Sequence, residues 1–100
     1  MANTAKQLAR AAASLTSATL YTVPASTTTV VTNIAVTNTA ASSATFTLGL
    51  NGVSLFTTSA IAANSTAFID LKQVLSATQT ITGLASAVTV NFHISGVEIA

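Results

Sequence analysis

Three side chains supply most of the acid–base chemistry open to this sequence: His93, Asp70 and Glu98. General acid–base catalysis needs two titratable groups within reach of one substrate, and serines are plentiful enough for a Ser-His-Asp arrangement. However, no Gly-x-Ser-x-Gly elbow frames any serine, and the alternation around His93 directs its imidazole away from the core, beside Asn91 and Ser95. The sequence therefore predicts no enzyme, and it predicts a hydrogen-bonding role for His93 at the surface or in an interface.

Metal and phosphate sites lack the residues that they need. The chain contains no cysteine, which excludes disulfides and thiolate metal sites. One imidazole and two distant carboxylates do not form a tetrahedral zinc site, and two carboxylates supply too few oxygens for calcium. No Gly-rich phosphate loop is present. We expect neither a metal nor a cofactor.

The chain carries very little charge: 5% of its residues are charged, 50% are hydrophobic and the formal net charge is +1. An ordinary soluble domain has roughly 25% charged residues. Because hydroxyls and methyls are far cheaper to bury than ionised groups, this composition favours a protein that packs against other copies or other proteins. Nucleic acid and anionic membranes require clustered cations, and a spanning helix requires roughly 18 to 20 apolar residues. The sequence contains neither a cluster of cations nor so long an apolar run, so nucleic acid and membrane are not expected partners.

The C-terminal part of the chain has the pattern of a β-strand. Apolar and polar residues alternate from Val88 to Ile94, as in a strand buried on one face. Gly96 interrupts the alternation, which resumes one residue out of step with Glu98 between two apolar residues. This pattern predicts a β-bulge at Gly96 and an outward Glu98.

Two further strands are expected earlier in the chain. The β-branched stretch Thr27–Thr37 favours a central strand, in which Val30, Ile34 and Val36 are expected to share one face with Thr32. Pro24 follows Tyr21–Val23 and removes a donor from the hydrogen-bond ladder, so that segment is expected to be an edge strand or a strand end.

The dipeptide Asn51-Gly52 separates Phe46–Leu50 from Val53–Phe56 and accepts the positive φ angles of a type I′ turn, which predicts a β-hairpin. Thr66–Leu71 and Gln79–Leu84 add two short strands. The aromatic residues are expected to fill the core: Tyr21, Phe46, Phe56, Phe68 and Phe92. The fold class is therefore all-β, an antiparallel β-sandwich of jelly-roll or immunoglobulin-like type with seven to eight short strands.

Residues 1–14 are expected to form an N-terminal arm, followed by a single sandwich domain over residues 15–100. The segment is rich in helix formers, but Leu8 is almost its only large apolar residue, and so short a helix is marginal. An arm that pairs with a neighbouring subunit suits this composition, and a frayed terminus is the alternative. Lys6 and Arg10, two of the three cations, would dock such an arm onto an acidic neighbour.

Several stretches resemble one group of proteins. These are Leu20–Ala25 (LYTVPA), the Thr-rich run Thr27–Phe46 and the ending Gly96–Ile99 (GVEI). The combination is similar to small structural proteins of tailed-bacteriophage virions. Such proteins are assigned either to the capsid exterior or to the tail, so the resemblance implies a virion component built on a β-sandwich and carries no chemistry.

The expected function is that of a non-enzymatic capsid decoration or cement protein on the exterior of the virion. Its expected partners are other copies of itself, in a homo-oligomer such as a trimer, and the major capsid protein or tail proteins. A tail or baseplate component is the alternative, and a glycan- or surface-binding module, suggested by Thr-rich strand faces, is the alternative of another class. The candidate interface residues are Lys6, Leu8, Arg10, Tyr21, Pro24 and His93.

Overall fold

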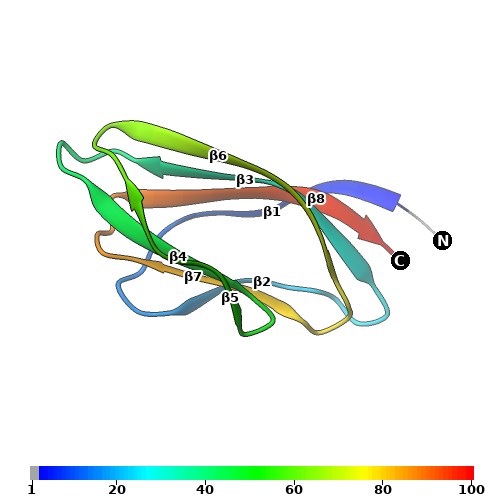
Figure 1. Ribbon diagram of the computed structural model, residues 1–100. Helices are drawn as coiled ribbons and strands as arrows, with labels where there is room; N and C mark the ends of the chain where they lie inside the picture. Colours follow the sequence, from blue (N-terminus) through cyan, green and yellow to red (C-terminus); the bar gives the residue numbers. More distant parts are fainter. Residues whose placement is uncertain (1–2) are drawn as a thin grey trace.

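Alternation of apolar and polar residues produces eight antiparallel strands in the computed structural model, which describes residues 3–100 (Figure 1). The strands are β1 (Asn3–Ala12), β2 (Ala18–Thr22), β3 (Thr28–Asn38), β4 (Ala44–Leu50), β5 (Val53–Ile61), β6 (Ser65–Leu75), β7 (Thr80–Ala85) and β8 (Val90–Ile99). The all-β prediction is confirmed.

Two four-stranded sheets form the sandwich. Sheet A has the order β1-β8-β3-β6 and sheet B the order β2-β7-β4-β5. The antiparallel pairs β1·β8, β2·β7, β3·β6 and β4·β5 are those of one long hairpin, whose two arms are the two halves of the chain. Winding that hairpin into two sheets gives the jelly roll, so of the two sandwich types expected from the sequence the chain adopts this one.

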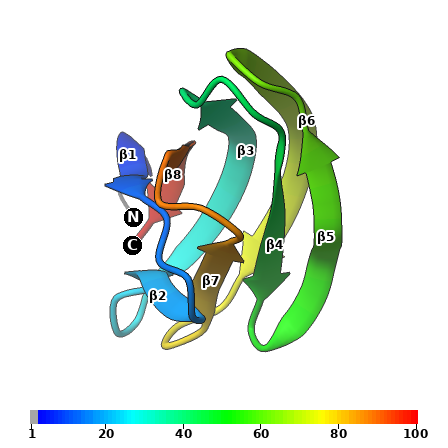
Figure 2. The same ribbon diagram turned by 90° about the vertical axis from the view of Figure 1, so that its left-hand side faces the viewer.

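The core lies between the inner faces of the two sheets, which Figure 2 shows from one end. Its largest fully buried side chains include Phe92 and Ile34 from sheet A and Leu48 and Ile81 from sheet B. Phe46 packs against Phe92 with ring centroids 6.4 Å apart in an edge-to-face arrangement. Burying each such side chain stabilises the fold by about 1.5–3 kcal/mol, so the two inner faces hold the sheets together.

The Asn51-Gly52 hairpin prediction is confirmed. Both residues have positive φ, 52° and 77°, as a type I′ turn requires, and they join β4 to β5. β3 is a central strand, since it pairs with both β6 and β8. β2 pairs with β7 and ends before Pro24, as expected for an edge strand.

The predicted position of one β-bulge is wrong. β8 keeps its alternation through Gly96, and the extra residue sits on its neighbour β3 at Thr32. The bulge moves Val31 onto the core face and Val30 onto the outer face, so Val30 does not share a face with Ile34 as expected. Position 96 requires glycine because a Cβ there would collide with the carbonyl oxygen of Val30. As a consequence Glu98 lies on the inner side of β8.

The predicted arm is also corrected. Asn3–Ala12 is strand β1 of the same sandwich, paired along its length with β8, and residues 1 and 2 of the predicted arm lie outside the described residues. Leu8 is 7% exposed and belongs to the core. β8 needs a ladder partner on its second side, and that pairing overrides the weak helical preference of the segment. The domain boundary at residue 15 is therefore wrong, because the sandwich begins with β1.

Candidate functional site: the outer face of sheet A

The strand register of sheet A aligns its outward side chains in four rows that cross the sheet. We call this surface face A. Its rows, each in the order β1, β8, β3, β6, are Ala5–Val97–Val30–Val74, Gln7–Ser95–Asn33–Asp70, Arg10–His93–Ala35–Phe68 and Ala12–Asn91–Thr37–Thr66. Residues far apart in the sequence become neighbours here because antiparallel partners on one face lie about 5 Å apart.

The row of Arg10, His93, Ala35 and Phe68 carries the chemistry of face A. His93 lies between the buried Phe92 and Ile94 on β8, so its imidazole points outward, as the sequence predicted. Phe68 is 76% exposed because Ala67 and Ile69, on either side of it, pack against the core. Phe68 therefore does not fill the core as expected.

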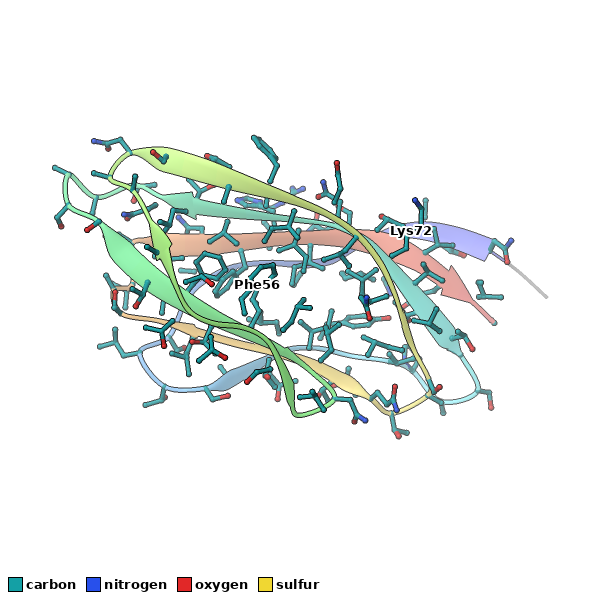
Figure 3. The ribbon with its side chains drawn as sticks, in the orientation of Figure 1. Phe56 and Lys72 are labelled. Atoms are coloured by element: carbon teal, nitrogen blue, oxygen red, sulfur yellow. The ribbon has the colours of Figure 1, made fainter. Side chains whose placement is uncertain are left out.

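The neighbouring rows surround this one with apolar and polar groups. Val74 is 64% exposed and continues an apolar row through Val30 and Val97. Asp70 lines a shallow hollow with Thr32 and Lys72. Figure 3 shows Lys72 pointing away from the interior of the sandwich and Phe56 lying between the sheets. Face A thus combines an exposed aromatic ring, exposed aliphatic side chains and charges of both signs.

A second polar cluster lies on the inner side of sheet A, near the chain termini. Glu98 accepts hydrogen bonds from Tyr21 and from Lys6, whose Nζ is 3.3 Å from Oε1. The Tyr21 hydroxyl is also 2.9 Å from the hydroxyl of Thr29. The cluster joins β1, β2, β3 and β8 and closes the end of the sandwich over the core.

The contacts in this cluster shift two pKa values. The hydrogen bond from Tyr21 lowers the pKa of Glu98 below its ordinary value of 4.5, burial opposes this, and Lys6 adds to the lowering. Burial first, and then the hydrogen bond to Glu98, raise the pKa of Tyr21 above 10.0. Both pKa shifts favour a protonated Tyr21 hydroxyl that donates to an ionised Glu98 carboxylate. This hydrogen bond stabilises the structure.

The candidate interface residues separate into four places. Arg10 and His93 are register neighbours on face A. Lys6 and Tyr21 meet at Glu98 on the inner side. Leu8 lies in the core, which excludes it from an interface, and Pro24 is exposed in the loop between β2 and β3.

The sequence reasoning missed Phe68 as a surface residue. A signal for it was present, because Phe68 alternates in step with Asp70 and Lys72, whose charges mark the solvent side of the strand. Assigning all aromatic residues to the core concealed that signal.

The groups considered for catalysis do not converge. His93 and Asp70 lie on face A, on β8 and β6 with β3 between them, whereas Glu98 lies on the inner side. Within residues 3–100 no three His, Asp or Glu side chains gather as a metal site would require. The same residues include no helix with the length and apolar character needed to cross a membrane.

The outer face of sheet B, which we call face B, is chemically different. Thr47, Gly49 and Thr82 lie on it, and with Ser54 and other residues they line a shallow hollow. The strands of sheet B contain no charged residue.

No family model, curated protein or solved structure gives a significant match to this chain.

Proposed function

We propose that this chain is a non-catalytic structural protein of a tailed-bacteriophage virion, acting as a capsid decoration protein that adds contacts to the shell. The observation that carries the proposal is face A, where Phe68 and Val74 on β6 are 76% and 64% exposed and Arg10 and His93 lie across the same sheet on β1 and β8. Exposed apolar side chains gathered among polar ones are characteristic of protein-binding surfaces, and aromatic residues and arginine are enriched in interfaces.

The jelly-roll fold and the composition agree with this proposal. Jelly rolls occur in viral capsid and lectin domains, which is support by analogy of fold alone. The resemblance of the segments around Tyr21 and Gly96 to virion proteins supports the same class. Because only 5% of the residues are charged, docking requires few ionised groups to be desolvated.

The mechanism of such a protein is burial of surface. Removing apolar area from water stabilises an interface by about 25 cal/mol per Å² before the cost of association. Repetition over the many equivalent positions of a shell turns weak contacts at each position into a large total stabilisation. The protein therefore needs a stable scaffold and a contact face, and no reactive group.

Co-sedimentation tests the proposal directly. The purified protein is mixed with heads and, separately, with tails from the phage whose genome carries the gene. We expect it to sediment with heads, and we expect Phe68→Ser to reduce the bound amount at least fivefold. The matched control is Leu15→Ser, which changes another exposed apolar residue, 61% exposed, in the loop between β1 and β2. Binding to tails alone would support the tail or baseplate alternative, and binding to neither would overturn the proposal.

Face B favours one candidate of another class, a glycan-binding module. The hydroxyls of Thr47, Ser54 and Thr82 border its hollow without any charge, and hydroxyl groups are donors and acceptors suited to sugars. A glycan array separates the two candidates. Glycan binding that Thr82→Val removes and Phe68→Ser leaves intact would support the module, whereas absence of glycan binding would exclude it.

A further inference from the structure

We propose that face A binds a second copy of this chain through a two-fold axis that runs parallel to the strands between β8 and β3. The inference rests on the proposed function in one respect, namely that face A is a protein contact surface. It adds the identity of the partner and the geometry of the contact. The argument uses the row order of the sheet and the charges on its two flanks.

A two-fold axis in this direction keeps each residue at its height along the strands and exchanges the two flanks of the sheet. β1 of one copy then lies over β6 of the other, and β8 lies over β3, because sheet A has the order β1-β8-β3-β6. Each of the four rows therefore faces the same row of the second copy, in reverse order. Packed sheets keep their strand directions within about 30° of each other, so the rows stay in approximate alignment.

In the dimer the row of Arg10 faces the same row of the second copy in the opposite order, and the side chains that meet are complementary. Arg10 of one copy faces Phe68 of the other, and the reciprocal contact forms on the opposite flank. A guanidinium over an aromatic ring is a favourable cation–π pair. His93 faces the small Ala35 of the second copy, which leaves room for the imidazole.

The adjacent rows are complementary in the same sense. Gln7 faces Asp70 of the second copy, where its amide can donate to the carboxylate. Arg10 is one row away from the same carboxylate, and Asp70 lies nearer to it along β6 than the cation Lys72, which is two residues further on. In the outermost row Ala5 faces Val74 of the second copy, and Val97 faces Val30, which gives an apolar contact.

The other face-to-face two-fold axis, perpendicular to the strands, gives a poorer contact. It places β1 over β1 and β6 over β6 of the second copy. Arg10 then approaches the β1 flank, which offers no carboxylate among its outward residues, and Phe68 and Asp70 approach their own counterparts. Like charges placed opposite one another cost free energy, and of the two axes the one parallel to the strands places Arg10 over the ring of Phe68, so we prefer that axis.

The size of face A is sufficient for a weak to moderate dimer. Four strands about 4.8 Å apart and about ten residues long at about 3.3 Å per residue present on the order of 700 Å². A standard protein interface buries about 800 Å² on each partner. The dimer occupies face A, so a decoration protein of this kind would add its contact to the shell by linking two copies through face A, with the edges of the sandwich free for the capsid protein. Two linked copies bind a repeating lattice more tightly than one, which is why Phe68→Ser is expected to weaken sedimentation with heads.

Light scattering after size exclusion tests the dimer on the intact chain. We expect a species of twice the 10.0 kDa chain mass at high concentration. We expect Phe68→Ser, Arg10→Glu and Asp70→Arg each to raise the dimer dissociation constant at least tenfold, and Leu15→Ser to leave it unchanged. Thermal melts confirm that every variant is folded.

A mixing experiment tests the geometry. In an equimolar mixture of Arg10→Glu and Asp70→Arg, the hetero-dimer pairs the introduced carboxylate with the introduced guanidinium on one flank and keeps the native pair on the other. We therefore expect the mixture to recover dimers that neither variant forms alone. Arg10→Gln and Asp70→Asn separate the two axes, because each removes an attractive contact under the axis parallel to the strands and a like-charge contact under the perpendicular axis. Tighter dimers of these two variants, or failure of the mixture to recover dimers while the wild type dimerises, would overturn the axis. A wild type that is monomeric at all concentrations would overturn the dimer.

The two proposals fail separately. A monomer that still sediments with phage heads overturns the self-contact and leaves the virion function standing. A dimer that binds neither heads nor tails overturns the virion function and leaves the self-contact standing.

Discussion

Faces A and B are built on the same scaffold and differ in nearly every chemical respect. All five charged residues and the one histidine lie on strands of sheet A, whereas the strands of sheet B carry none. Face A also exposes Phe68 and Val74, and face B offers Thr47 and Thr82. Since side chains on a strand alternate between two sides, each sheet can keep an apolar inner face and vary its outer face freely.

The difference indicates where binding specificity can reside. Aromatic residues and arginine are the usual anchors of protein interfaces, and serine and threonine are rarely so. Face A has both anchor types in one row, Arg10 and Phe68. Face B presents the hydroxyl groups of Thr47 and Thr82 with Leu84 among them, and the residues that line its hollow include neither an aromatic ring nor an arginine.

Removing residues 3–12 tests whether sheet A needs its first strand. The deletion strips β1 from β8 and takes the buried Leu8 from the core. A buried leucine alone is worth about 2–5 kcal/mol, so we expect the loss to consume most of the stability of a domain whose total is about 5–15 kcal/mol. Urea unfolding followed by circular dichroism measures it. The control is the pair Lys6→Ala and Arg10→Ala, which keeps the strand, and wild-type stability after the deletion would show that β1 is a dispensable arm.

Matched glycine substitutions compare the inner faces of the two sheets. In Gly96→Ala of sheet A the new methyl would collide with the carbonyl of Val30, a backbone atom that cannot move without the strand. In Gly83→Ala of sheet B the new methyl would meet side-chain ends and no backbone atom: Cδ1 of Leu20 at 2.9 Å, and Cδ2 of Leu48 and Cε2 of Phe92 at 3.1 Å. We expect losses of about 3 kcal/mol and about 1 kcal/mol in the free energy of unfolding. Chemical denaturation measures both losses. If the two substitutions lower the free energy of unfolding equally, the close contact between Gly96 and Val30 does not arise from the bulge in β3.

Gly52→Val tests the turn that joins the edge strand β5 to sheet B. No atom lies within 4 Å of a Cβ at this position, so the cost comes from the φ of 77° alone. A β-branched residue there is expected to destabilise the fold by more than about 1 kcal/mol. Asn51→Gly, which retains the positive φ, should change the free energy of unfolding by about 0.5 kcal/mol or less. An unchanged melting temperature for Gly52→Val would refute the type I′ turn.

The smallest expected effect concerns the inner cluster of sheet A and its dependence on pH. Because the folded pKa of Glu98 lies below 4.5, its ionised form adds stability above that value, and this stability is lost as pH falls through the folded pKa. Glu98→Gln should therefore lower the melting temperature at neutral pH and lose that effect as the pH falls below 4.5 and through the folded pKa of Glu98.

Asp70→Asn on face A is the control for this experiment, since it removes an exposed carboxyl without touching the cluster. A difference between wild type and Glu98→Gln that stays constant with pH would show that Glu98 acts through packing alone. Tyr21 is expected to affect stability at high pH instead. Its raised pKa adds stability below pH 10.0, and this stability is lost as pH rises through the folded pKa.

Part of the candidate site was accessible from the sequence. The outward direction of His93 follows from the alternation around it, and the placement of Asp70 and Lys72 on one strand face follows from their spacing. The contact between Arg10 and His93 was not accessible, because no local pattern pairs a residue at the start of the chain with one near its end. The position of Val30 was misjudged because the bulge at Thr32 depends on the neighbouring strands.

The sequence by itself determined the strands that follow β1, the Asn51-Gly52 turn and the low charge, because alternation, turn conformation and composition are local properties. Only the tertiary structure decided that residues 3–12 complete sheet A, that Glu98 lies inside and that Arg10, His93 and Phe68 form one row. The physical reason is that register and bulges are fixed by pairing between distant strands. A shift of one residue there reverses every side chain between core and solvent.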